Sequence, residues 1–165
     1  MSSGVVVSAD CQSTFQKLSE GKDKIRYIFY KIEEKEVVVE AAVTVDQMQI
    51  SGDDYEDNSK TAYEAFVKDL KDRTNGFKDC RYAVFDFKFT CQRPGAGASK
   101  MDKLVFIQFC PDGAPIKNKM VYASTASAIK QCLGTAILLQ FQVSDEAEMA
   151  HKELLNKLIE KYRDN

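Results

Sequence analysis

The segment DGAPIKNKMVYASTASAIKQCLG, residues 112–134, carries lysines near both ends of a stretch rich in alanine and serine. Lys119 and Lys130 are eleven residues apart, and at about 100° per residue their side chains leave a helix within about 20° of each other. Ala123 and Ala126 lie nearby on the same side. Lysine ammonium groups form charge-assisted hydrogen bonds with carboxylates and phosphates. The spacing therefore predicts a cationic strip on the helix whose other side chains are small.

The boundaries and packing of this helix leave two interpretations open. Asp-Gly makes the preceding turn, Pro115 suits the first helical position, and Gly134 suits the C-terminal stop. Lys117 lies some 160° from Lys119 in a regular helix, so it joins the strip only if the first turn deviates. The plausible packing positions are Ile116, Met120, Ala123 and Leu133. The lysines are then either contact residues or merely solvated groups on a helix that packs closely on a sheet.

Residue types suited to enzymatic or metal chemistry are few. His151 is the only histidine, which argues against histidine-based metal clusters and catalytic triads, and we expect it on a helix surface. PGAGAS lacks the following Lys-Ser/Thr of a phosphate-binding loop. The five cysteines stand mostly in apolar runs, which favours buried, unreactive thiols over nucleophiles. We therefore expect no enzymatic activity, no metal and no cofactor.

Length and composition restrict the class of protein. A chain of 165 residues with 44% hydrophobic and 29% charged residues predicts one domain over residues 1–165. The formal net charge of -2 provides no overall field toward nucleic acid or membrane. An odd number of irregularly spaced cysteines and the absence of a signal-peptide pattern predict a cytosolic location. No run approaches the roughly 18 apolar residues of a membrane span.

The first half of the chain reads as helix, hairpin, helix. Ser8 suits the N-cap of a short helix that carries Cys11, Phe15 and Leu18 on one side, and Gly21 suits its end. Two β-rich runs, residues 25–32 and 37–45, are joined by the charged turn EEKE and predict a hairpin. A helix follows over about residues 59–73, with a stripe of apolar positions: Ala62, Phe66 and Leu70.

The second half adds three strands and two helices. RYAVFDFKF alternates from residue 83, and KLVFIQFC, residues 103–110, is apolar on both faces and suits a central strand. CQRPGAGASKMD between them predicts a projecting hairpin connection. ILLQFQV follows the lysine-bearing helix as a strand, and Ser144 suits the start of a last helix. Apolar positions of that helix are Ala147, Ala150, Leu154 and Leu158. The order αββαββαβα predicts an α+β domain with a mixed sheet between helices.

Four segments together resemble the actin-depolymerising factor/cofilin family. APIKNKMVYASTASAIK resembles its long actin-binding helix, and the likeness extends to MSSGV at the N-terminus, CRYAVFDFKF in the sheet and KLVFIQFCPDGAP before the helix. It covers essentially the whole chain, and nematode members resemble it most. The family implies a single ADF-homology domain that binds actin monomers and filament sides, favours the ADP state, and promotes depolymerisation and severing.

The resemblance also assigns residues. It implies that the outer face of the long helix enters the cleft between two actin subdomains, with these monomer contacts: Ser3, Gly4, Val5, Lys117, Lys119, Met120, Ser124 and Lys130. Ser3 matches the regulatory phosphorylation site, although Ser2 is an adjacent competing hydroxyl, and the alternative is an ordinary frayed terminus. A phosphate there adds about -1.5 to -2 charges facing an acidic partner.

A second surface matches the family less closely. Lys100 and Lys103 on the hairpin correspond to the filament-side surface, but Met101 and Asp102 interrupt their cluster. Candidate cations on the last helix are Lys157, Lys161 and Arg163, for which a solvated helix face is an equally good interpretation.

Two further functions compete with filament disassembly. One is a membrane-surface module that binds phosphatidylinositol bisphosphate through the same lysines. The other is an actin-monomer sequestering protein with weak severing. We expect a monomer in the cytoplasm, at the actin cytoskeleton. Co-sedimentation with filaments and flotation with liposomes separate actin binding from lipid binding.

Overall fold

Six strands form one mixed sheet in the computed structural model, which describes residues 4–20, 24–48, 59–93, 95, 97–134 and 138–163. The strands are β1 (Val6–Val7), β2 (Ile25–Glu33), β3 (Glu36–Thr44), β4 (Arg81–Arg93), β5 (Gly97–Phe109) and β6 (Leu138–Val143). Their order across the sheet is β1-β3-β2-β4-β5-β6. The outer pairs β1–β3 and β5–β6 are parallel, and the inner pairs are antiparallel. The predicted mixed sheet is confirmed.

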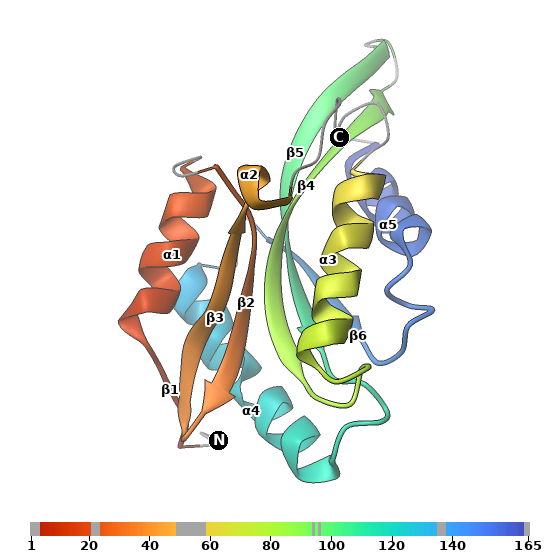
Figure 1. Cartoon of the computed structure of the whole chain (residues 1–165). Coiled ribbons are helices and arrows are strands. Elements are labelled where there is room, and N and C mark those ends of the chain that lie inside the picture. The colour runs from red at the N-terminus through yellow and green to blue at the C-terminus, as the bar shows by residue number, and fades with distance from the viewer. Residues whose placement is uncertain are drawn as a thin grey trace.

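Helices cover both faces of this sheet (Figure 1). They are α1 (Ala9–Ser19), α2 (Val45–Met48), α3 (Lys60–Arg73), α4 (Ile116–Leu133) and α5 (His151–Arg163). Buried residues of α1 and α4 share one hydrophobic cluster, and those of α3 and α5 share the other. The predicted element order is confirmed, and the short elements β1 and α2 are additional to it.

Alternation along β4 explains why the sheet has two cores. Phe85 and Phe87 point into the cluster under α3 and α5, whereas Tyr82 and Val84 point into the cluster under α1 and α4. Successive strand residues face opposite sides, so a strand covered on both sides must be apolar at both sets of positions. The tight β2–β3 turn has Glu34 and Lys35 at φ 50° and 67°, as a two-residue hairpin turn requires.

The connection between β4 and β5 is shorter than predicted. The two strands pair without interruption from Arg81 and Phe109 to Arg93 and Gly97, so most of CQRPGAGASKMD belongs to the strands. The antiparallel ladder satisfies the backbone of this ribbon whatever its side chains are, which outweighs the turn preference of the small residues. The ribbon projects from the body of the domain, as expected (Figure 1).

Two predicted helix starts are wrong. The last helix begins at His151 rather than Ser144, because the backbone N–H and hydroxyl of Ser144 both donate to Oε1 of Glu148, at 2.9 and 2.7 Å. Glu148 N–H in turn donates to Oδ1 of Asp145, and such local side-chain bonds favour turns over helix. Pro115 precedes α4 as its N-cap and is not its first helical residue.

Two expectations about reactive side chains also change. His151 is half-buried and its ring stacks on Phe87, with centroids 5.6 Å apart, so it is not a simple surface residue. Cys11 and Cys80 are buried as expected, but Cys110 and Cys132 are half-exposed.

A buried polar link joins α3 to the sheet. Arg26 is 2% exposed, and its Nη2 donates to the Ser59 hydroxyl at 2.7 Å. That hydroxyl donates to the carbonyl of Lys88 at 2.7 Å and accepts the Lys88 N–H at 2.9 Å. Ser59 immediately precedes α3, and it therefore positions the helix start against β4.

We expect Ser59→Ala to lower the free energy of unfolding by about 2 kcal/mol, because it removes these bonds from buried groups. Urea denaturation should show a lower midpoint with an unchanged slope. Ser19→Ala is the matched control, since Ser19 is exposed and bonds only locally to the Gln16 carbonyl. An equal effect of the two substitutions would contradict a structural role for Ser59.

Candidate functional site

One stripe of α4 packs on the sheet and thereby determines which residues face outward. The buried positions are Tyr122, Thr125, Ala126, Ile129 and Leu133. Their spacing of three and four residues is that of a single helix face. Of the four packing positions predicted from sequence, only Leu133 is buried, and Ala126 belongs to the packed side rather than to the cationic strip.

Hydrogen bonds hold α4 in place beneath this stripe. The Tyr122 hydroxyl accepts the backbone N–H of Ile32 at 2.9 Å, and the Tyr82 hydroxyl donates to the Tyr122 carbonyl. Burial raises the pKa of Tyr122 to about 12, so this phenol stays neutral at physiological pH. Asn118 Nδ2 donates to Oδ1 of Asp79 at 3.3 Å. The first turns of α4 are therefore fixed to β2 and to the segment before β4.

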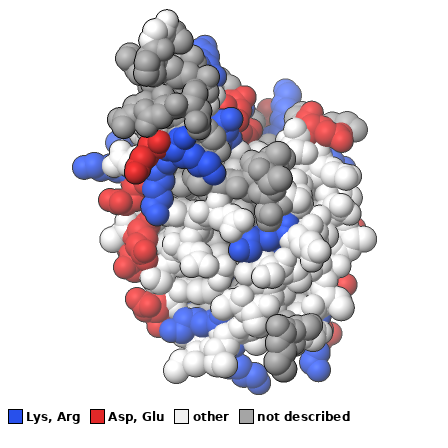
Figure 2. Space-filling model, turned by 180° about the vertical axis from the view of Figure 1, so that it is seen from behind, with Lys and Arg blue, Asp and Glu red and all other residues white. Residues whose placement is uncertain are grey.

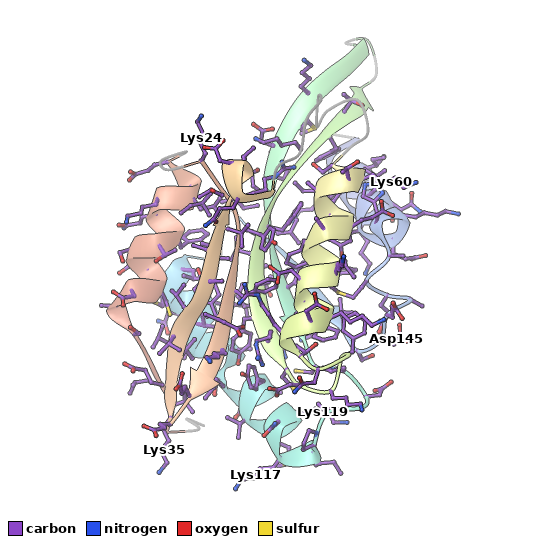
Figure 3. The ribbon with its side chains drawn as sticks, in the orientation of Figure 1. Lys24, Lys35, Lys60, Lys117, Lys119 and Asp145 are labelled. Atoms are coloured by element: carbon purple, nitrogen blue, oxygen red, sulfur yellow. The ribbon has the colours of Figure 1, made fainter. Side chains whose placement is uncertain are left out.

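The lysines of α4 lie on two flanks. Lys119 N–H donates to the Pro115 carbonyl at 3.1 Å, the bond of a regular first turn, so Lys117 does not join the strip of Lys119 and Lys130. Lys117 is exposed, while Lys119 is half-buried. Lys130 is also half-buried, and its Nζ donates to Oε1 of Gln140 at 3.1 Å. Figure 3 shows Lys117 and Lys119 at the lower end of the molecule, beside the first turn of α4.

Small side chains fill the rest of the outer face. Ala123, Ser124, Ser127 and Ala128 are all exposed. The Ser124 hydroxyl donates back to the Val121 carbonyl at 3.2 Å and so stays close to the helix. A partner could therefore approach the backbone of α4 over two turns without displacing a large side chain.

Large apolar side chains are exposed on the first two turns of α4 and on strand β1, which contacts this helix. Among the described residues, the large hydrophobic side chains that remain exposed are Val6 at 61%, Ile116 at 72% and Met120 at 66%. Strand β1, which contains Val6, contacts α4, and both lie toward the same end of the molecule (Figure 1). We define Val6, Ile116 and Met120 as the apolar end patch. Isolated exposed hydrophobics are common, but a group of them indicates an interaction site.

The N-terminal contact residues are partly described. Gly4 is exposed and adopts a positive φ of 80°, and Val5 is half-buried against the cluster under α1 and α4. Ser3 lies outside the described residues. The predicted contacts Gly4 and Val5 therefore lead directly into the apolar end patch through Val6.

Val6 and Ile116 are exposed apolar residues that the sequence does not single out as candidate contacts. The signal for Ile116 was present, because the stripe from Tyr122 to Leu133 already accounts for the packed side of the helix and places Ile116 and Met120 away from it. Val6 gave no comparable signal, because a two-residue strand shows no periodicity.

A polar groove of about 410 Å³ runs beside the exposed Lys117. Its charged lining residues are Lys31, Glu33, Asp79, Arg81 and Lys117. Arg81 is engaged by Oε1 of Glu40 at 2.8 Å and Oδ2 of Asp79 at 2.9 Å, and Lys31 lies 3.6 Å from Glu33. Most charged residues that line the groove therefore form ion pairs with one another or with Glu40. Such a groove is better suited to the polar edge of a protein interface than to binding a small anion.

The hairpin lysines do not form one patch. Both Lys100 and Lys103 lie in β5, and three-residue spacing in an unbroken strand directs them to opposite sides of the ribbon. Met101 is buried and so does not interrupt a surface cluster. Asp102 does interrupt it, and its Oδ1 lies 3.6 Å from Nζ of Lys88.

The lysines of α5 are placed more regularly. Lys157 and Lys161 are one turn apart and exposed, while Leu154 and Leu158 are buried beneath the helix. Nζ of Lys157 lies 4.9 Å from the centroid of the Phe141 ring, a cation–π contact. Helix α5 and the hairpin tip lie at the end of the molecule opposite the start of α4 (Figure 1).

The face of the molecule that carries α4 has large uncharged areas with separate basic groups. Figure 2 shows the face behind that of Figure 1, and most of it is uncharged, with acidic groups concentrated along one margin. Across the described ranges, no group of three or more His, Cys, Asp or Glu side chains is arranged to hold a metal ion. Within the same residues, no helix is long and apolar enough to cross a membrane.

Comparison with known proteins assigns the chain to a family. The sequence model of the family described as "Cofilin/tropomyosin-type actin-binding protein" matches residues 4–159. Actin-depolymerizing factor 1, isoforms a/b, of Caenorhabditis elegans is 67% identical over 156 residues, covering 94% of this chain and 74% of that protein. The cofilin of Schizosaccharomyces pombe is 34% identical, covering 96% and 98% of the two chains.

A solved structure supports the same assignment. The solution structure of the ADF-like UNC-60A protein of Caenorhabditis elegans superimposes with a TM-score of 0.84 at 67% identity, with 100% of both chains covered. Sequence and fold agree, and the chain belongs to the cofilin/tropomyosin-type family of actin-binding proteins.

Proposed function

We propose that this protein binds actin monomers and the sides of actin filaments, and that it promotes filament disassembly. The observation that carries the proposal is the apolar end patch, Val6, Ile116 and Met120, exposed beside the small-residue face of α4. None of these side chains is needed to cover a core. A relative named for actin depolymerisation shares 67% of aligned residues with this chain, which supports actin as the partner.

The face of α4 suits insertion into a cleft of the partner. Exposed Ile116 and Met120 can be buried by the partner, and Ala123 and Ser124 permit close approach of the helix backbone. Apolar centres with polar rims are the usual organisation of protein interfaces. Lys117 on one flank and Lys119 and Lys130 on the other can pair with acidic groups of actin. The proposed monomer site therefore comprises the N-terminal segment from Ser3 and both flanks of α4.

The second proposed surface lies at the opposite end of the domain. Lys157 and Lys161 of α5, together with Lys100 and Lys103 of the hairpin, are proposed to contact a second actin subunit along the filament. Separation of the two ends of the domain allows one molecule to touch two subunits at once (Figure 1). The irregular placement of the hairpin lysines makes α5 the larger contributor to this surface.

Disassembly follows from differential binding and requires no covalent chemistry. A ligand shifts an equilibrium by its difference in affinity for the two states, so preference for ADP-actin and for a changed filament geometry promotes subunit loss or severing. We propose that the protein is not an enzyme, uses no cofactor, and acts as a monomer at the cytoplasmic actin cytoskeleton.

Phosphoinositide binding is the weaker alternative. A phosphorylated headgroup needs several cations directed at one point. Lys117 lies on the flank of α4 opposite Lys119. The side chain of Lys130 is already hydrogen-bonded to Gln140. Flotation with vesicles containing phosphatidylinositol bisphosphate, compared with vesicles of neutral lipid, measures this activity directly.

Ile116→Gln with Met120→Gln should weaken actin binding at least tenfold in co-sedimentation and monomer-binding assays, because two apolar contacts are lost. The melting temperature should change little, since both side chains are exposed. Ile129→Val is the control on the same helix: Ile129 is buried, so that substitution should lower stability by about 1 kcal/mol and preserve affinity. Undiminished binding of the double variant would contradict the proposed role of α4.

The two lysine surfaces should separate monomer from filament binding. Lys117→Ala with Lys119→Ala should reduce both, since each desolvated charge-assisted contact contributes roughly 1.5 to 3 kcal/mol. Lys100→Ala with Lys103→Ala should reduce filament co-sedimentation and severing while inhibition of monomer nucleotide exchange stays intact.

The control for charge is Lys60→Ala with Lys68→Ala on α3, where both lysines are exposed on the face opposite α4. Full filament binding by the hairpin variant would mean that α5 alone forms the second surface, or that the protein works mainly on monomers. Single-filament microscopy of that variant distinguishes the two explanations, because only a severing protein breaks filaments between their ends.

Ser3→Glu should weaken actin binding without a shift in melting temperature of more than a few degrees, because a negative charge at the terminus faces an acidic partner. Ser2→Glu is the matched control for a charge one residue away. Equal affinity of the Ser3 variant and the unmodified protein would remove Ser3 from the proposed site.

A further inference from the structure

Two cysteines face each other where β4 begins and β5 ends. The last paired residues of this ladder are Arg81 and Phe109, so the next positions outward are Cys80 and Cys110. Both belong to or pack against the hydrophobic cluster under α1 and α4, which places them on the same side of the sheet. The two thiols are near enough for each to shift the pKa of the other.

The backbone pattern makes this a closely spaced pair. Cys110 N–H donates to the Val143 carbonyl of β6 at 3.0 Å, so the polar backbone groups of Cys110 point away from β4. Opposed residues of that kind form a non-hydrogen-bonded pair, with Cα atoms about 4.5 Å apart and side chains close together. Disulfides span Cα separations of about 4.4 to 6.8 Å. The backbone therefore needs little movement to accept a bond between the two sulfurs.

Cys110 is the more reactive member. It is half-exposed and lines a groove of about 230 Å³ with Gln108, Gln142 and Ser144. Donation from the Cys80 thiol lowers the pKa of Cys110 despite its partial burial, with further support from the Gln108 amide, 4.0 Å from Sγ, and the charge of Lys119. The same pairing and its burial raise the pKa of Cys80.

The acidic residue that lines this groove is engaged by other hydrogen bonds. Glu148 also lines the groove, but its carboxylate accepts the N–H and hydroxyl of Ser144. Nucleophilic attack requires a thiolate with access to solvent. Cys110 has a lowered pKa and a partly exposed side chain, which favour both conditions. The partial exposure of Cys110 departs from the expectation that the cysteines are buried.

We propose that Cys80 and Cys110 form a peroxide-sensitive thiol pair, in which Cys110 is oxidised first and Cys80 then closes a disulfide. The Cys110 thiolate attacks one oxygen of hydrogen peroxide, the O–O bond breaks, and the released hydroxide takes a proton to become water. Cys110 is left as a sulfenic acid. The Cys80 sulfur attacks the Cys110 sulfur, its proton leaves with the hydroxyl group as a second water, and the S–S bond forms.

The balance is two thiols oxidised and one peroxide reduced to two waters. The product ties the segment entering β4 to the segment that leads from β5 into α4. The oxidation does not involve actin, so a negative result for the thiol pair would leave the proposed actin-binding function untouched, and the reverse also holds.

A second pair of cysteines is less suited to the same reaction. Cys11 is near enough to Cys132 for their charges to interact, but Cys11 is fully buried and its Sγ donates to the Val37 carbonyl at 3.3 Å. Burial raises the pKa of Cys11 to about 12, which keeps it protonated. Cys132 is half-exposed like Cys110, and this makes it the matched control.

The test treats the reduced, folded full chain with equimolar hydrogen peroxide, blocks free thiols by alkylation, and analyses tryptic peptides by mass spectrometry. Trypsin separates the two cysteines into residues 79–81 and 104–117. The expected product is the linked pair of these peptides, two hydrogens lighter than their sum and released by reduction. A product that links Cys11 to Cys132, or oxidation that leaves Cys110 free, overturns the proposal.

Substitutions then establish the order of events. Cys80→Ala should stop the reaction at a Cys110 sulfenic acid, captured by a 1,3-diketone probe, and should raise the pH midpoint of Cys110 alkylation because the thiol donor is lost. Cys110→Ser should leave Cys80 reduced, and Cys132→Ser should leave the 80–110 link unchanged. Circular dichroism verifies folding of each variant. A Cys80→Ala protein that is folded but yields no trapped sulfenic acid overturns the assignment of Cys110 as the attacking thiol.

Discussion

The packing of α4 on the sheet is the constraint on which the remaining surface depends. Tyr122 and Ile129 must be buried, because the face of β2, β4 and β5 beneath them is apolar. Once that stripe is fixed, helical geometry alone decides that Met120 and Ser124 point outward and that Lys117 and Lys119 diverge. The hydroxyl of Tyr122 also satisfies the N–H of Ile32, so the same residue fixes both the depth and the direction of the helix.

The β4–β5 ladder connects features at opposite ends of the domain. Its uninterrupted register carries the ribbon outward to Gly97 and, at the other end, brings Cys80 opposite Cys110. Side chains alternate strictly between the two faces of a strand that has no bulge. The register that buries Met101 therefore also places Lys100 and Lys103 on opposite sides of the ribbon. One backbone register thus explains both the divergence of the hairpin lysines and the proposed pairing of Cys80 with Cys110.

Periodic segments could be predicted from the sequence, and segments stabilised by particular side-chain bonds could not. The stripe of α3 and the alternation of β4 follow directly from apolar spacing. The start of α5 could not be found this way, since Ser144 satisfies the N-cap pattern yet bonds to Glu148 within a turn. Periodicity alone makes Ile116 and Met120 plausible packing positions, and the resemblance adds Met120 as a candidate contact. The full buried stripe to Leu133 shows that both side chains face outward. The roles of the lysines came from family resemblance, because their charge and spacing fit a solvated face equally well.

The size of the apolar end patch explains why lysines must accompany it. Complete burial of an isoleucine or methionine contributes about 1.5 to 3 kcal/mol, so Ile116 and Met120 together supply roughly 3 to 6 kcal/mol. Association costs about 4 to 15 kcal/mol in lost motional freedom, so apolar contact alone gives weak binding at best. The same limit disfavours self-association through this end of the domain, where the lysines of one copy would face those of another. A partner with acidic groups around an apolar cleft would supply both the missing apolar area and the opposite charge, which is the chemistry that the proposed site on α4 requires.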